Sequence, residues 1–225
     1  MIAFIKDAYI VFVKDLKIEW RTRNTSGHVL PFAFFVLVFF GFTFNSSQTV
    51  LEQATPGLIW MVVLFVTIVA AENSLRLETE NEAVRLLLTG GVLPAAIFVG
   101  KVGSVVLQLL FVELVLVPGA VVFYASDVES LPLVVAASAG ATIGLATVGC
   151  LLSTVVVGVK ARRTVLPILF MPLVSPVLVA ATRAFGDAFG VFAVNGWSWT
   201  GLLALFAVVN LIVGAMMYSQ LLEDI

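Results

Sequence analysis

The feature that most constrains this chain is a series of apolar stretches long enough to cross a lipid bilayer. Residues 131–159 contain no charged side chain, and about 20 helical residues at ~1.5 Å each span the hydrocarbon core. Only 12% of the 225 residues are charged, which is about half of what a soluble domain carries. Because no stretch alternates apolar and polar residues as barrel strands do, the sequence predicts an all-α integral membrane protein.

Six apolar runs are expected to be transmembrane helices in a single membrane domain that covers residues 1–225. The runs cover residues 29–44, 56–75, 94–124, 131–159, 164–182 and 197–221. Thr55 is expected to cap the second helix, with Pro56 in the first turn, where proline is favoured. An odd number of spans would require one run to lie outside the bilayer, and the fifth, which holds three prolines, is the first candidate for that.

The distribution of positive charge predicts the orientation of these helices. With the N-terminus in the cytoplasm, 11 of the 12 Lys and Arg residues fall on the cytoplasmic side, and Arg183 falls outside. Segments rich in Lys and Arg stay on the cytoplasmic side of a membrane. We therefore expect both termini of this multi-pass protein to be cytoplasmic.

Residues 1–23 form no span and are expected to be an amphipathic helix on the membrane surface. On a helix their apolar side chains share one stripe roughly 100° wide, and basic residues lie beside it. The stripe comprises Ile2, Ile5, Tyr9, Phe12, Val13, Leu16 and Trp20. An apolar stripe with a basic flank is typical of a helix in the headgroup layer. The alternative is a basic tail without such a position.

The polar segment ETENEAVRLLLTGG, residues 78–91, falls in the cytoplasm between the second and third spans. Thr79 and Glu82 fit a capping box, and Gly90 and Gly91 can end a helix. The segment therefore predicts a short cytosolic helix over residues 80–88, with an apolar face that docks into a groove of another protein. The alternative is a tight turn whose leucines dip into the membrane surface. The residues of the predicted contact are Glu80, Glu82, Val84, Arg85, Leu87 and Leu88.

Three collinear blocks of the sequence resemble the haem exporter protein B family, the CcmB-type permeases of cytochrome c maturation. The blocks are TPGLIWMVVLF at residues 55–65, AENSLRLETENEAVRLLLTGGVLPAAIFVGK at 71–101 and VGVKARRTVLPILFMPLVSPVLVAAT at 157–182. The resemblance extends over essentially the whole chain. Six spans after an interfacial helix are also similar to small ABC permeases of the ABC-2 type. One departure is the run Thr89-Gly90-Gly91, where the family often has a proline.

The resemblance implies a permease subunit of an ABC transporter complex for haem export or delivery, located in the cell inner membrane. A separate cytosolic ATPase subunit would bind and hydrolyse ATP, because this chain has no phosphate-binding loop of its own. ATP-driven motion would reach the permease through the helix at residues 80–88, which is the coupling helix of such transporters. Further implied partners are a second permease copy in a homodimer, a haem-handling membrane subunit and a periplasmic haem chaperone. No nucleic acid is expected.

Three other functions remain open at this stage. An ABC-2-type exporter of another substrate, such as a drug or a glycan, would have the same architecture. A non-conducting assembly subunit could instead drive release of the haem chaperone from a neighbouring subunit. A secondary transporter that uses Glu113 as a proton carrier is disfavoured, because there is one such carboxylate and no internal repeat.

Several polar residues are candidates for functional roles within the spans and at their ends. Glu113 lies in the third span, where a carboxyl group is costly and marks a candidate site; the alternative is packing at a helix interface. Glu72 and Arg76 stand four residues apart and are expected to form an ion pair that transmits motion. A cytosolic basic loop between the fourth and fifth spans contains Lys160, Arg162 and Arg163.

The sequence shows no catalytic cluster and no metal-ligand spacing, so neither enzymatic activity nor a metal site is expected. Cys150, the one cysteine, lies in an apolar run, and His28, the one histidine, lies at the start of the first span. We expect no cofactor bound by this chain: haem would be cargo, and ATP would be bound by the partner. The outer segment with Phe185, Phe189 and Phe192 is expected to dip back into the membrane.

Overall fold

The computed structural model describes residues 2–22, 24–44, 48–81, 91–124, 126–156 and 162–223. Side chains are described for residues 4–21, 27, 29–44, 49–73, 91–124, 126–156 and 164–221. These residues form seven helices and no strand. The helices are α1 (Ile2–Thr22), α2 (Asn24–Thr43), α3 (Gln48–Asn81), α5 (Pro94–Tyr124), α6 (Leu131–Val155), α7 (Arg162–Ala188) and α8 (Gly196–Glu223).

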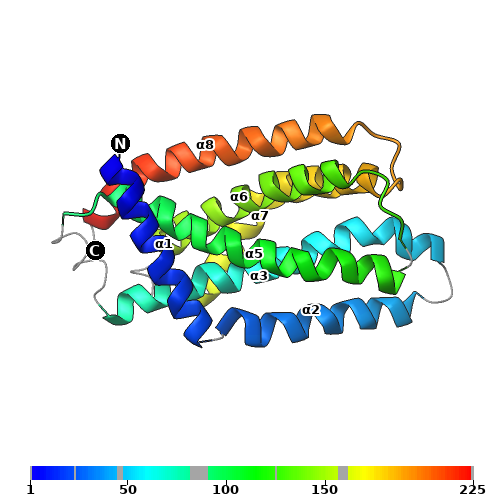
Figure 1. Cartoon of the computed structure of the whole chain (residues 1–225), viewed down its shortest axis with the longest axis horizontal. Coiled ribbons are helices and arrows are strands. Elements are labelled where there is room, and N and C mark those ends of the chain that lie inside the picture. The colour runs from blue at the N-terminus through cyan, green and yellow to red at the C-terminus, as the bar shows by residue number, and fades with distance from the viewer. Residues whose placement is uncertain are drawn as a thin grey trace.

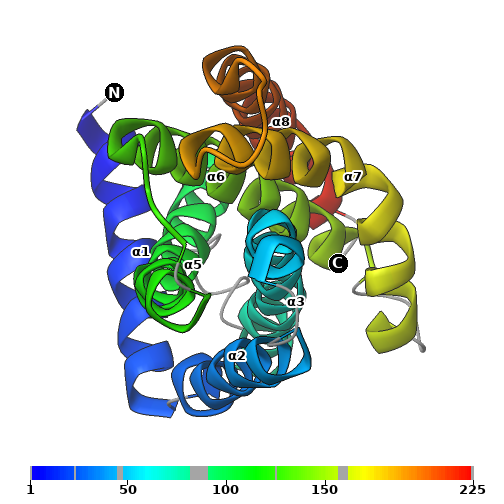
Figure 2. The ribbon, with the colours of Figure 1, turned by 90° about the vertical axis from the view of Figure 1, so that its right-hand side faces the viewer.

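The helices from α2 to α8 lie side by side along the long axis of the molecule and alternate in direction (Figure 1). The beginning of α1 and the last turn of α8 lie at the same end, which we call the terminal end (Figure 1). Viewed along the bundle, α3 lies in the interior with α2, α5, α6 and α7 around it, and α1 lies outside α5 (Figure 2). The buried residues Ile59, Trp60, Val62 and Val63 of α3 contribute to the apolar core.

Five helices in the described part of the chain are long and apolar enough to cross a membrane. They cover Thr49–Asn73, Pro94–Tyr124, Leu131–Val155, Thr164–Ala188 and Gly196–Leu221, and Val29–Thr43 is a shorter apolar helix. The prediction of an all-α, multi-span membrane protein is confirmed. Five of the six predicted spans correspond to these long helices, and the first predicted span corresponds to the shorter helix Val29–Thr43.

The prediction that Thr55 caps the second span is wrong. α3 begins at Gln48, about two turns earlier, and Pro56 lies inside it. Proline has no N–H to donate, which weakens the helix locally. The Thr55 hydroxyl donates to the Leu51 carbonyl at 2.8 Å and lies 3.4 Å from the Ser126 Oγ. Packing inside the bundle therefore allows α3 to begin before Thr55 and Pro56, although these two residues are typical of a helix start.

α7 is continuous through its three prolines and runs six residues beyond the predicted end of the fifth span, to Ala188. The expectation that the following phenylalanines dip back into the membrane is wrong for Phe185 and Phe189. Both side chains are buried in the protein core, and the Phe185 ring lies 5.0 Å from the ring of Trp60 on α3. These rings pack between helices α3 and α7.

α1 crosses α5 at a point of close backbone approach. A Cβ atom at Gly100 would lie 2.6 Å from the Ala8 carbonyl oxygen and 2.8 Å from the Val11 Cβ. At Gly103, one turn further along α5, the nearest atom would be the Phe12 ring at 3.3 Å. Only glycine permits the closest of these approaches, so α1 is packed directly on α5.

Part of the apolar stripe predicted on α1 points away from the bundle, and Phe12, Val13 and Leu16 are half-buried. Ile5, Tyr9 and Trp20 are 61%, 65% and 83% exposed, whereas Val11, on the opposite side, is fully buried. α1 therefore contacts α5 through Val11 and through Phe12 of the stripe, whereas Ile5, Tyr9 and Trp20 face outward.

Candidate functional site

A buried ion pair links α1 to α5 next to the helix crossing. The Lys101 Nζ lies 3.6 Å from one oxygen of Asp15, and the Lys14 Nζ lies 3.0 Å from the other. Lys101 is only 4% exposed and the Asp15 side chain 13%. A charge buried to this extent needs a partner of opposite sign, so the Asp15 carboxylate holds α1 on α5 at the position where Gly100 allows contact.

The sequence did not reveal this ion pair, although it carried two signals. Lys101 follows Gly100 inside an otherwise apolar helix, and Asp15 falls four residues after Val11, on the buried side of the amphipathic helix. The two partners are 86 positions apart, so only the fold brings them together.

Glu113 lies inside the bundle, between α5 and α6, and is 3% exposed. The Thr142 hydroxyl on α6 donates to its Oε1 at 2.5 Å, whereas its buried Oε2 has no hydrogen-bond partner in the described part of the chain. Ser138, one turn earlier on α6, is also buried. The polar candidate predicted from sequence is therefore a contact between two helices.

Replacing Glu113 with leucine should lower the free energy of unfolding by about 1–3 kcal/mol, because the buried Thr142 hydroxyl loses its side-chain acceptor. Glu113→Gln keeps an acceptor oxygen at the same place and should cost clearly less. Thermal unfolding in detergent measures both variants. Equal destabilisation by leucine and glutamine would show that the negative charge, and not the hydrogen bond, is what stabilises this contact.

Of the other predicted site residues, Glu72, Arg76 and Glu80 lie on α3. Glu72 is half-buried on α3, and Arg76 follows one turn later on the same helix, although its side chain is not among those described. Their ion pair stays a prediction. α3 ends and α5 begins at the terminal end (Figure 1).

The predicted helix at residues 80–88 falls mostly outside the described residues, as do Glu82, Val84, Arg85, Leu87, Leu88 and Lys160. Glu80 lies in the last turn of α3, and Arg162 and Arg163 begin α7, with side chains that are not described. The capping box at Thr79 is wrong. α3 continues to Asn81, and a capping residue needs a non-helical backbone. Residues 75–80 contain Leu, Arg and Glu, which favour continuation of the helix.

Within the described part of the chain, no three His, Cys, Asp or Glu side chains come together as metal ligands. The charged contacts in the membrane-spanning region join helices to one another. Such contacts can hold a bundle together or guide its movement.

Together these features define a class, that of multi-span α-helical membrane proteins in which buried polar contacts join neighbouring helices. The family model described as "CcmB protein" matches residues 6–223. The chain therefore belongs to the CcmB family, the haem exporter protein B family, as its three sequence blocks predicted. Among curated proteins, a sequence search finds no match. Membership makes the chain a membrane component of a haem-export ABC transporter complex in cytochrome c maturation.

Proposed function

We propose that this chain is the permease subunit that receives ATP-driven motion from a cytosolic ATPase subunit and passes it to haem delivery outside the inner membrane. The observation that carries the proposal is the match to the CcmB family over residues 6–223. The arrangement of the helices supports a mechanical role. α3 is a continuous helix of 34 residues, about 50 Å long, and packs against α2, α5, α6 and α7.

Residues 80–88 are the contact for the ATPase in this proposal. They join the end of α3 to the beginning of α5, so a force on them acts on both helices. α5 in turn carries α1, through Gly100 and the pair of Lys101 with Asp15. It also contacts α6 through Glu113 and Thr142. A push at one connection therefore reaches most of the bundle through rigid helices.

The protein has six spans in this proposal, with α2 as the first. α2 has 20 residues, about 30 Å of helix, and runs beside α3 and α5 (Figures 1 and 2). Phe32 packs edge-on against Phe65 of α3, and Phe34 against Phe123 of α5. With six alternating spans, the first span begins and the last span ends on the same side of the membrane. This agrees with two cytoplasmic termini and with the positive-inside rule.

α1 lies in the cytoplasmic headgroup layer in this proposal. Its exposed stripe of Ile5, Tyr9 and Trp20 supports this position, because Tyr and Trp favour the interface between lipid and water. The second copy of the permease, the haem-handling subunit and the haem chaperone are further proposed partners.

The proposed function is tested by deleting this chain in its own cells. Covalently haem-bound c-type cytochromes should disappear while b-type cytochromes, whose haem is not attached by this route, persist, and the full chain should restore them. Normal cytochrome c levels in the deletion strain would contradict the proposal and favour export of another substrate. Haem flux in vesicles, with and without the haem-handling subunit, separates conduction by this chain from release of the chaperone.

A further inference from the structure

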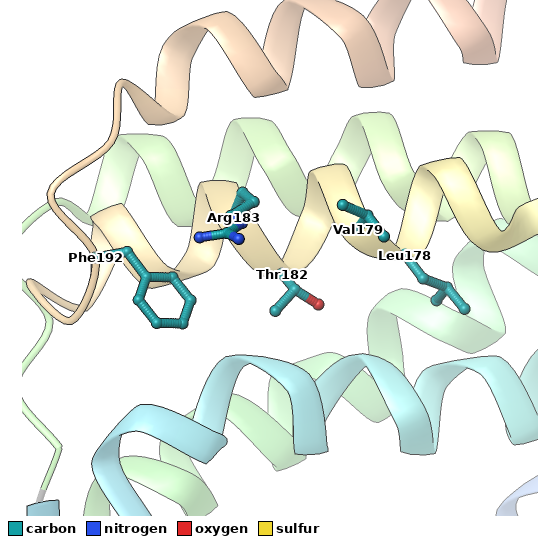
Figure 3. Close-up of a pocket in the computed structure, with 5 residues that line it drawn as sticks. All are labelled: Leu178, Val179, Thr182, Arg183 and Phe192. Carbon is teal, nitrogen blue, oxygen red and sulfur yellow. The ribbon is translucent and has the colours of Figure 1, made fainter. Parts of the chain in front are cut away.

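A pocket of about 450 Å³ opens on the side of α7 near the end of the bundle opposite the terminal end. It is lined by Leu178, Val179, Thr182, Arg183 and Phe192. Figure 3 shows Thr182 and Leu178 directed toward α3, and Phe192 reaching the pocket from the segment between α7 and α8. Neither the hydrophobic pattern nor the family resemblance pointed to this pocket.

Arg183 and the ring of Phe192 lie together at one end of the pocket. The Arg183 guanidinium carbon lies 5.4 Å from the centre of the Phe192 ring, a cation–π distance. Phe192 is held in place because its backbone N–H donates to the Gly186 carbonyl at 3.0 Å. A Cβ atom at Gly186 would overlap the ring, so glycine makes room for it. The ring thus fixes where the guanidinium lies.

The Arg183 guanidinium is available to bind an anionic ligand. Arg183 is exposed and forms no ion pair with a carboxylate of the described residues. Asp187, one turn further along α7, accepts a hydrogen bond from the Gly196 N–H at 2.9 Å and is directed to the start of α8. An arginine with five donors matches a phosphate well.

The order of groups along α7 matches the order of groups in a phospholipid. Arg183 lies five residues before the last residue of the span Thr164–Ala188, about 8 Å inside its end, and from there its long side chain can extend toward the lipid phosphates. Leu178 and Val179 lie about one turn deeper, and Val179 is 55% exposed, at the depth of the acyl chains. The positive charge of Arg183 therefore lies on the headgroup side of the pocket, and the apolar side chains of Leu178 and Val179 lie on the acyl-chain side.

We propose that this pocket binds an anionic phospholipid of the outer leaflet, with its phosphate on Arg183 and one acyl chain along Leu178 and Val179. The bound lipid fills the space between α7 and α3 and supports the outer half of α7. The pocket is ill suited to haem as a lasting ligand, because its lining offers no His, Met, Cys or Tyr to coordinate iron.

The test measures lipid binding to the purified, intact complex. After mild delipidation, phosphatidylglycerol or phosphatidylcholine is added and bound lipid is counted by native mass spectrometry. The wild type should retain phosphatidylglycerol in preference to phosphatidylcholine. Arg183→Gln should weaken phosphatidylglycerol binding about tenfold, the effect of losing a charge-assisted contact, and Arg183→Lys should keep most of it.

Two further variants make the outcome decisive. Val179→Trp fills the apolar part of the pocket without changing charge, and should also reduce lipid binding. Val208→Trp places the same large side chain at an equally exposed position of α8 outside the pocket and should have no effect. Unchanged phosphatidylglycerol binding by both Arg183→Gln and Val179→Trp would overturn the proposal. So would haem that binds in an Arg183-dependent way and displaces the lipid, because the pocket would then belong to the cargo.

Discussion

Replacing Leu87 and Leu88 together with aspartate should reduce the yield of c-type cytochromes at least about tenfold, with the chain still inserted in the membrane. Two carboxylates placed in an apolar contact lose their hydration, and a central contact residue contributes roughly 2 kcal/mol or more to binding. The ATPase subunit should no longer co-purify with the permease. The yield is measured by haem staining of cell proteins, and the association by affinity purification from membranes.

The matched control for this variant is Leu87→Ile with Leu88→Ile, which keeps the apolar surface and nearly the same volume. It should assemble and support cytochrome maturation at close to the wild-type level. If the double aspartate variant also assembles and hydrolyses ATP at the normal rate, residues 80–88 are not the contact, and the leucines lie against the membrane surface as in the alternative interpretation.

The second large effect is expected at the ion pair between α1 and α5. Asp15→Asn removes a negative charge 3.6 Å from the Nζ of Lys101, which is 4% exposed, and should destabilise the protein by about 3 kcal/mol. Lys101→Met should cost less, because Asp15 keeps Lys14 at 3.0 Å and methionine suits an apolar position. Unfolding by heat or denaturant in detergent, with the amount of each variant in the membrane, measures both changes.

The double variant, Asp15→Asn with Lys101→Met, tests whether the two residues act as a pair. It removes the buried charge together with its partner, so it should be more stable than Asp15→Asn alone. If the two destabilising effects simply add, the residues do not stabilise each other, and α1 is held on α5 by the glycine crossing instead.

The apolar pattern predicted most of the fold. The third span was placed at residues 94–124, the bounds that α5 has, and the fourth span begins at residue 131 as α6 does. Polar or turn-forming residues flank these helices, so the local sequence predicts where they begin or end. The ends of α3 and α7 depend instead on packing. Thr55 and Ser126 meet in the bundle, Phe185 packs on Trp60, and both helices extend beyond their apolar cores.

The candidate site was predictable only in part. Glu113 was recognisable as a costly group within a span, but its partner Thr142 is 29 positions away on another helix. Asp15 with Lys101, and Arg183 with Phe192, are likewise contacts between separate elements. A single sequence indicates which groups need partners and leaves the choice of partner to the tertiary structure.

The most direct test of the central claim, that an ATPase subunit contacts the connection between α3 and α5, is a cross-linking measurement. Cys150 is 3% exposed, so a cysteine introduced as Leu88→Cys reacts with little competition. In intact membranes, a reagent that joins a cysteine to a nearby lysine should link position 88 to the ATPase subunit. Ala193→Cys, an exposed position near the opposite end of the bundle, should give no link. A link from residue 193 but none from residue 88 would contradict the account.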